Sequence, residues 1–225
     1  MIVRLVMQTL LSLVVMGAVL FAAAGTLAWL AAWLYLLEIG VVGIWVGLWL
    51  ARVDPDLLVE RMRPFISRDQ QAWDRVFMSI VLVGMFAWLA LMGFDGVRFG
   101  WSRVPLWLNV VGAIAVFVVF WLTRDVYRAN HFATPMVEIQ HKRGHKVVDS
   151  GPYAIVRHPM YAAAMLFFIG TPLMLGSWWG LACMPLLTAA LGYRAVREER
   201  VLVEGLPGYR EYRQRVRYRF VPGVW

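Results

Sequence analysis

Two short segments in the second half of the chain hold the residue types that could do chemistry. Residues 151–161 contain two prolines, two tyrosines, one arginine and one histidine, directly before a new apolar run. The acidic pair Glu198 and Glu199 follows the last apolar run, and Arg194 stands four residues before Glu198. Ionisable side chains at the edges of apolar segments indicate a polar site at a membrane boundary.

Local sequence rules predict how these segments fold. Because proline disfavours helical backbone at the preceding residue, the chain should be extended at His158 and a helix should begin at Pro159. The unpaired N–H groups of such a helix start could bind a negative group, although a basic helix entry that anchors the chain at the interface has the same sequence. Likewise, Glu198 and Glu199 are compatible with a salt-bridged helix end, or with acids that face residues 157–159 if the intervening apolar run folds back.

The composition excludes a soluble globule. Of the 225 residues, 61% are hydrophobic and 16% are charged, which leaves too little polar surface to cover a soluble domain of this size. We therefore expect an integral membrane protein with a single domain over residues 1–225. Its net charge of +8 is not accompanied by a nucleic-acid recognition motif, so we expect no nucleic-acid partner.

The apolar runs predict the fold class. A membrane span takes roughly 20 residues, and the runs 5–24, 29–50, 76–94 and 104–122 meet that length. Two shorter runs, 162–175 and 178–193, are separated by Gly176 and Ser177 and predict a helical hairpin whose second arm is kinked at Pro185. The expected fold is all-α: a polytopic integral membrane helical bundle of four spans (residues 1–123) plus a C-terminal helical hairpin within a catalytic part (residues 124–225).

The positions of lysine and arginine predict the orientation. If each apolar run crosses the membrane once, successive loops lie on alternate sides of it. Only Arg98 and Arg103 of the 22 basic residues then lie on one of the two sides. The other side receives the arginine-rich segment 210–219 and the arginines of the second loop, which are Arg52, Arg61, Arg63, Arg68 and Arg75. We expect a multi-pass protein with both termini in the cytoplasm.

Other polar residues are assigned structural roles. Glu38 lies inside the second run, where an acid is a functional candidate, but we expect a carboxyl near an interface or bonded to a neighbouring helix. The histidines do not have the spacing of a metal site, because the charged residues between His141 and His145 indicate a solvated turn. Around that turn, residues 137–140 and 146–149 predict a short β-hairpin. Cys183 is expected to be a small core residue.

Several motifs occur in a recognisable order. They are Gly151-Pro152-Tyr153, Arg157-His158-Pro159-x-Tyr161, Glu198-Glu199-x-x-Leu202 and Pro207-Gly208-Tyr209-x-x-Tyr212, followed by Val216. In this order and spacing the segment 137–225 resembles the isoprenylcysteine carboxyl methyltransferase family and the related phospholipid methyltransferases. The resemblance implies an integral membrane enzyme that uses S-adenosylmethionine in a helical cofactor pocket on the cytoplasmic side.

The resemblance also implies roles for individual residues. The cofactor would be bound by both motif segments, whose candidate residues are Gly151, Tyr153, Arg157, His158, Pro159, Tyr161, Glu198 and Glu199. Arg194 would lie near the reacting groups as the catalytic residue. One position departs from the family pattern, because Ala163 stands where the family often has glycine.

The function expected from these features is methyl transfer from S-adenosylmethionine to a lipid-like or prenylated acceptor, at its carboxylate, with membrane lipids as the surroundings. Amine and thiol acceptors remain open. Two alternatives also remain. One is an NADPH-dependent membrane reductase of the lipid or sterol type, and the other is a non-enzymatic membrane protein that binds anionic lipid through residues 210–219.

Overall fold

The computed structural model describes residues 1–64, 66 and 70–225, and Arg68 lies outside these residues. Four helices are long and apolar enough to cross a membrane: α1 (Ile2–Ala24), α2 (Leu30–Val53), α4 (Ala72–Gly93), which continues through the π-helical turn η1 (Phe94–Arg98), and α5 (Leu106–Ala129). The four predicted spans are therefore confirmed. Helix α5 extends well beyond residue 122, so its polar last turns belong to the same rigid element as the span.

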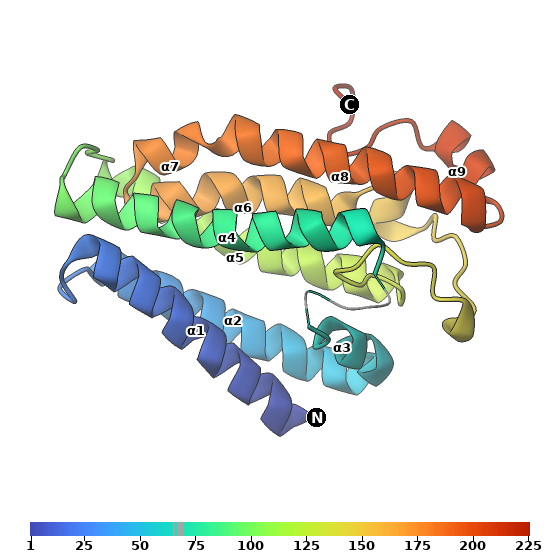
Figure 1. Cartoon of the computed structure of the whole chain (residues 1–225), viewed down its shortest axis with the longest axis horizontal. Helices are drawn as coiled ribbons and strands as arrows, with labels where there is room; N and C mark the ends of the chain where they lie inside the picture. Colours follow the sequence, from blue (N-terminus) through green and yellow to red (C-terminus); the bar gives the residue numbers. More distant parts are fainter. Residues whose placement is uncertain (65, 67–69) are drawn as a thin grey trace.

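The helices stack in layers along one common direction. In Figure 1, α1 and α2 lie at the bottom, α4 and α5 in the middle, and α6 (Pro159–Leu175) and α8 (Met184–Gly205) above them. Helices α5 and α6 approach closely enough for their backbones to touch, because a Cβ atom added at Gly112 would lie 2.4 Å from the Met174 nitrogen. Small residues allow such approach in membrane bundles. Asn109 of α5 also donates a 2.7 Å hydrogen bond to the Leu173 carbonyl of α6.

The predicted C-terminal hairpin is confirmed. Helix α6 ends at Gly176, whose φ of 79° is left-handed, and Ser177 caps α7 (Trp178–Ala182) by accepting from the Gly180 nitrogen at 2.8 Å. The second arm breaks at Cys183 and resumes as α8, with Pro185 in its first turn. Because proline lacks an N–H group, it is suited to a first helical turn and interrupts a continuing one.

The β-hairpin predicted around residues 137–149 is wrong. The described residues contain no strand, and this segment forms only the 3-10 turn η2 (His141–Arg143), which ends at Gly144 with φ 64°. Other elements provide its partners: the Val137 nitrogen donates to Asp74 of α4 at 3.1 Å, and Ile139 packs beside Gly205 of α8 and against the cluster of Leu206 and Tyr209 that follows it. Backbone and side-chain contacts with the helices therefore replace strand pairing.

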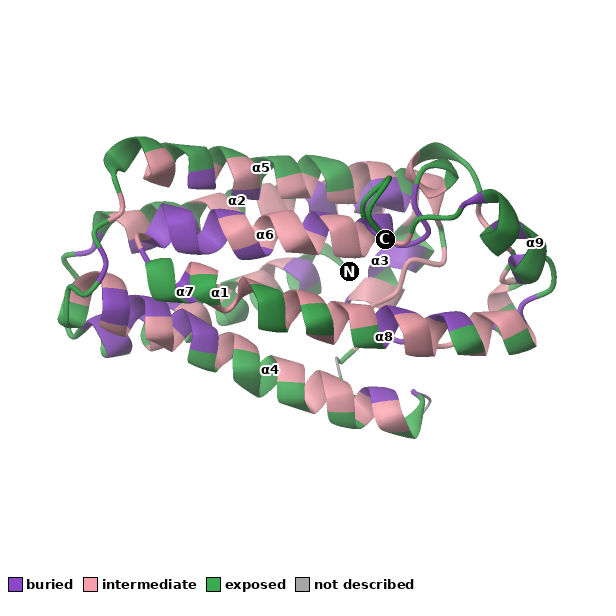
Figure 2. Cartoon of the chain, turned by 90° about the horizontal axis from the view of Figure 1, so that it is seen from above, coloured by how far each residue is buried: buried purple, intermediate pink, exposed green. Residues whose placement is uncertain are grey.

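The burial pattern suits a bundle immersed in lipid. Figure 2 shows buried residues where helices face one another and exposed ones along the outer faces of α4 and α5, and most residues of α1 are exposed as well. The outward residues include large apolar side chains such as Val14, Val83 and Ile114, each more than half exposed. A lipid-facing surface is apolar because hydrocarbon replaces water around it. The chain is a multi-pass integral membrane protein.

The polar parts of the chain gather at the two ends of the bundle. In Figure 1 the N-terminus, α3 (Pro55–Arg61) and α9 (Tyr209–Arg215) lie at one end. Arg98 and Arg103 belong to the α4–α5 turn at the opposite end. The side of the membrane that each end faces stays a prediction. Within α2, Glu38 is half-buried, and its Oε1 atom has no hydrogen-bond partner among the described residues.

Candidate active site

A cavity of about 290 Å³ lies at the polar end of the bundle that carries α9. Five of the predicted site residues line it: Tyr153, His158, Tyr161, Arg194 and Glu198. The remaining predicted residues, Gly151, Arg157, Pro159 and Glu199, lie beside the cavity and not on its lining. The two motif segments therefore meet. Some of their residues line the cavity, and the others lie behind its wall.

The entry to α6 has the predicted local structure. His158 is non-helical, with φ −127°, and Pro159 occupies the first turn of α6. The backbone nitrogens of Arg157 and His158 each donate 2.9 Å hydrogen bonds, to the carbonyls of Tyr218 and Arg219. These two N–H groups are therefore used by the C-terminal segment. Gly151, at the start of the 3-10 turn η3 (Gly151–Ala154), has φ 58°, a conformation that favours glycine.

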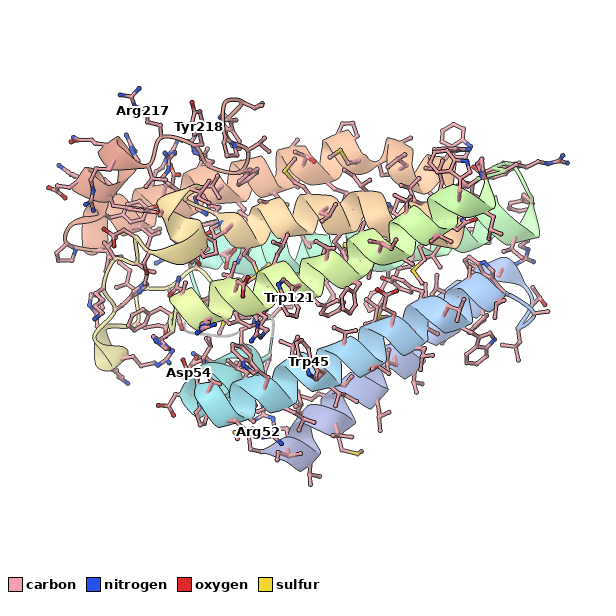
Figure 3. The ribbon with its side chains drawn as sticks, turned by 180° about the vertical axis from the view of Figure 1, so that it is seen from behind. Trp45, Arg52, Asp54, Trp121, Arg217 and Tyr218 are labelled. Atoms are coloured by element: carbon pink, nitrogen blue, oxygen red, sulfur yellow. The ribbon has the colours of Figure 1, made fainter. Side chains whose placement is uncertain are left out.

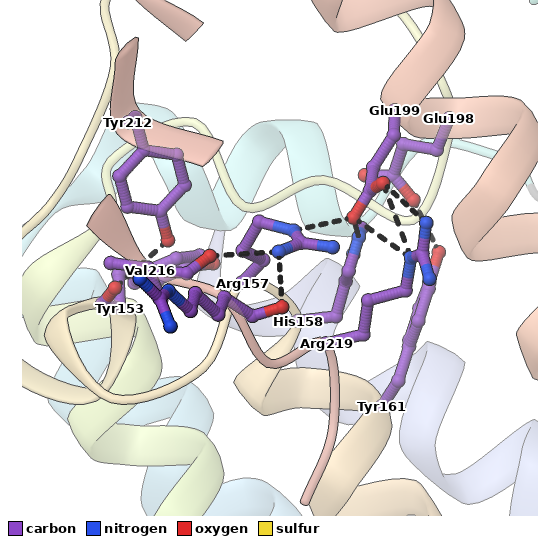
Figure 4. Close-up of polar contacts among 10 residues, drawn as sticks. Tyr153, Arg157, His158, Tyr161, Glu198, Glu199, Tyr212, Val216 and Arg219 are labelled. Carbon is purple, nitrogen blue, oxygen red and sulfur yellow. Dashed lines mark hydrogen bonds and ion pairs between the residues drawn. The ribbon is translucent and has the colours of Figure 1, made fainter. Parts of the chain in front are cut away.

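Glu199 is the centre of a buried ionic cluster (Figure 4). Its carboxylate accepts from Arg157 Nε at 2.7 Å and from Arg219 Nη2 at 3.1 Å, and it contacts His158 Nε2 at 3.2 Å. Arg157 completes its own hydrogen bonding with the carbonyls of Val216 and Arg217, both at 2.7 Å. Although burial alone would raise the pKa of Glu199, the hydrogen bonds from His158 and Arg157 lower that pKa to about 2. Glu199 is therefore ionised and fully engaged.

Glu198 has a different environment from its neighbour. It lines the cavity, and the Tyr161 hydroxyl donates to Glu198 Oε2 at 2.6 Å. Among the described residues no arginine, lysine or histidine forms an ion pair with it. One carboxylate of the pair is therefore neutralised by the protein, while the other presents negative charge to the cavity.

Arg194 is linked to Glu198 through Tyr161 and not directly. Arg194 Nη1 donates to the Tyr161 hydroxyl at 3.0 Å. Its ion-pair partner is Asp74 of α4, which lies 2.9 Å from Arg194 Nε and is fully buried. Arg194 therefore pairs with Asp74 and not with Glu198, although Arg194 and Glu198 are four residues apart on α8. Arg194 and Glu198 share a face of α8, but the carboxylate that lies within hydrogen-bond distance of the Arg194 guanidinium is that of Asp74.

Aromatic rings form much of the remaining wall. The rings of His158 and Tyr161 stack at 5.2 Å between centroids, and Phe220 meets both of them edge-on. The Tyr212 hydroxyl donates to the Tyr153 carbonyl at 2.8 Å, which fixes α9 against η3. Burial, followed by the negative charge of Glu198, raises the pKa of Tyr161 well above its ordinary value, so this hydroxyl remains a hydrogen-bond donor.

Some residues at the site could not be assigned from the sequence. Asp74 had no visible partner, because Arg194 is far from it along the chain, and its only signal was an acid in the first turn of a span. His145 lines the cavity and stacks on Phe132 at 4.6 Å. Burial and the positive charges of His141 and Arg143 lower the pKa of His145 to about 4.

Residues 107–206 match the family model described as phospholipid methyltransferase. A curated protein from Arabidopsis thaliana, "Protein-S-isoprenylcysteine O-methyltransferase B", is 26% identical over 97 residues, which cover 42% of this chain and 47% of that protein. The chain thus matches about half the length of this relative. The two matches confirm the resemblance that the motifs indicated: over residues 107–206 the chain matches the phospholipid methyltransferase family.

Proposed function

We propose that this protein transfers a methyl group from S-adenosylmethionine to the carboxylate of a lipid-like or prenylated acceptor at the cytoplasmic face of the membrane. The observation that carries the proposal is the difference in surroundings between the two carboxylates of the acidic pair Glu198 and Glu199. Glu199 is neutralised by three basic side chains, whereas Glu198 faces the cavity and, within the part of the chain that the structure describes, has only a tyrosine hydroxyl as its partner. Glu198 is half-buried, and a carboxylate that is partly shielded from water and has no cation beside it is suited to bind a cationic ligand.

The cavity lining fits the proposed cofactor. S-adenosylmethionine supplies a methyl group bonded to a positively charged sulfur, next to an ammonium group and a planar adenine. Glu198 would hold the positive part, and the rings of Tyr153, Tyr209 and Tyr212 offer aromatic surface for the planar part. Tyr161 keeps Glu198 oriented through its 2.6 Å hydrogen bond.

The same surroundings favour the reaction physically. Methyl transfer from a sulfonium ion to a carboxylate removes two opposite charges, so a cavity with little water favours the transition state over the separated ions. The protein mainly needs to hold the two partners in line, which can supply several kcal/mol. Arg194 lines the cavity, where its Nη1 donates to the Tyr161 hydroxyl while Asp74 holds the guanidinium group in place. It would orient the acceptor carboxylate, and an ionised carboxylate needs no general base.

A second cavity supports a lipid-like acceptor. An apolar slot of about 190 Å³ lies between α2 and α5, and Arg61 lines both this slot and the main cavity. A Cβ atom added at Gly43, in the slot, would meet no atom within 4 Å. We infer that the acceptor's hydrocarbon chain occupies the slot while its carboxylate reaches past Arg61 towards Arg194. The matched relative is likewise named for a lipid-modified substrate.

The alternatives are less well supported. Two arginines of segment 210–219 are engaged in internal ion pairs, since Arg215 lies 2.7 Å from Asp149 and Arg219 is bound to Glu199. These two arginines are therefore less available to bind anionic lipid. An NADPH-dependent reductase would bind a phosphate-rich cofactor; Arg61, Lys146 and Arg194 line the cavity, but the carboxylate of Glu198 there would repel those phosphates.

The proposal is tested by transfer of a labelled methyl group from S-adenosylmethionine into total membrane lipid by the purified chain, with mass identification of the product. Calorimetry in detergent should show cofactor binding to the wild type, at least tenfold weaker binding to Glu198→Gln, and unchanged binding to Glu204→Gln, an exposed acid on the same helix. Gly43→Leu should lower methyl transfer without changing cofactor affinity, with Gly84→Leu on the outer face of α4 as its control. Equal cofactor affinity for wild type and Glu198→Gln would refute the site.

A further inference from the structure

A cluster of arginine and tryptophan side chains lies on the facing surfaces of α2 and α5. Trp45, Trp49 and Arg52 follow one another at helical spacing on α2, and Trp121, Arg124 and Arg128 do the same on α5. Figure 3 shows Trp45 and Trp121 pointing toward each other between the two helices, with Arg52 near the end of α2. Their rings stack at 6.3 Å between centroids, with an interplanar angle of 12°. We name these six residues the arginine–tryptophan cluster.

Arg124 is the central cation of this cluster. Its guanidinium carbon lies 5.0 Å from the Trp121 ring centre, 5.1 Å from that of Trp49 and 6.0 Å from that of Trp45. Its Nε atom is buried and has no hydrogen-bond partner among the described residues. Of the residues described, the half-exposed Asp125 is the one that forms an ion pair with Arg124, at 3.7 Å, which is longer than a hydrogen bond. The planar cation is therefore held in place by the rings, while its Nε donor has no partner in the described part of the chain.

The cluster lies at the depth where a lipid headgroup would be. Arg124 stands about one and a half turns before the end of α5, and Trp49 stands about one turn before the end of α2. Trp45 and Trp121 are 45% and 49% exposed, so their rings face the surroundings of the bundle. Tryptophan is enriched at the membrane–water interface, and arginine there extends its charge towards the headgroups.

Two further arginines extend the positive charge towards the polar end. Arg52 and Arg128 are exposed, and within the described part of the chain neither forms an ion pair. Asp125 offsets only one of the three arginine charges. This set of planar donors suits a phosphate group, which arginine binds through paired N–H bonds. The cluster is separate from the arginine-rich segment 210–219 and from the main cavity lining.

We propose that the arginine–tryptophan cluster binds the phosphate headgroup of an anionic phospholipid, with the indole rings against its glycerol and upper acyl region. The occupant follows from charge and depth: the three arginines require an anion, and the apolar helix surface below them requires hydrocarbon. This site is additional to the proposed methyl transfer and does not depend on it. It would hold one lipid next to the helix end that leads into Asn130 and the main cavity.

Native mass spectrometry of the full chain in detergent, titrated with phosphatidylglycerol, tests the proposal. The wild type should retain one phosphatidylglycerol in preference to phosphatidylcholine. Each arginine near the surface contributes about fivefold to anionic-lipid affinity, so Arg124→Gln and Arg128→Gln should each weaken retention about fivefold. Arg98→Gln, which removes an exposed arginine over the single ring of Phe94 at the opposite end, should change nothing.

The outcomes separate the possible sources of the anion. Unchanged phosphatidylglycerol retention in Arg124→Gln and Arg128→Gln, or an equal loss in Arg98→Gln, would overturn the site. Equal retention of phosphatidylcholine would overturn its selectivity for anionic lipid, and inorganic phosphate binding as tightly as phosphatidylglycerol would overturn its assignment to a lipid. Because Arg128 is exposed, its variant tests the proposal even if Arg124→Gln does not fold.

Discussion

Replacement of Glu199 by glutamine should destabilise the protein by about 2–3 kcal/mol. Glutamine keeps the size of the side chain, but it removes the charge and places an NH₂ group against guanidinium donors. The side chains of Arg157 and Glu199 are only 5% and 3% exposed, so the charge of Arg157 would remain without its partner in a place that solvent scarcely reaches. Removal of one member of a buried ion pair is costly for this reason.

The magnitude follows from the pKa of Glu199. A carboxyl whose pKa falls from 4.5 to about 2 is stabilised in its charged form by roughly 3 kcal/mol. Solvent that reaches Arg219, which is 23% exposed, reduces this to about 2 kcal/mol. The sign is fixed by the lowered pKa: this stability is present above about pH 4.5 and is lost as the pH falls towards 2.

The assay is denaturation of the purified protein by sodium dodecyl sulfate in mixed micelles, together with limited trypsin cleavage of residues 216–225. Glu199→Gln should unfold earlier and release this segment, because Arg219 loses its ionic partner. Glu204→Gln on the same helix should change stability by less than about 0.5 kcal/mol. If Glu199→Gln were as stable as Glu204→Gln at neutral pH, the cluster would not be the anchor of the C-terminal segment.

Two further predictions concern single positions. In a chain with labelled histidine, His145 should titrate near pH 4, because its burial and the nearby positive charges lower its pKa; a nuclear magnetic resonance midpoint near the ordinary 6.5 would contradict its placement in the cavity wall. Gly112→Ala should destabilise the α5–α6 contact by about 1–3 kcal/mol, because the new methyl group meets backbone atoms within 3 Å, whereas Gly84→Ala meets none within 4 Å. Equal thermal stability of the two alanine variants in detergent would show that α5 and α6 are less closely packed.

The sequence alone determined the class of the protein and the outline of its site. Four apolar runs are long enough to span a membrane, and in lipid their backbone N–H and C=O groups find hydrogen-bond partners if the runs are helical. The break at Gly176 and Ser177 imposed a turn. That turn brings Glu198 back to the level of His158, so the meeting of the two motif segments was predictable. These features depend on local sequence and on the length of the chain between them.

Only the tertiary structure decided which partner each charged side chain has. Glu198 and Glu199 are neighbours of the same type, yet the helix directs Glu199 to three basic side chains and Glu198 to the cavity. Asp74 pairs with Arg194 across 120 residues, and the segment 137–149 takes its partners from α4 and α8 instead of pairing with itself. The physical reason is that a buried charge or backbone group must find a partner in space, and the packing of distant helices determines which one is close enough.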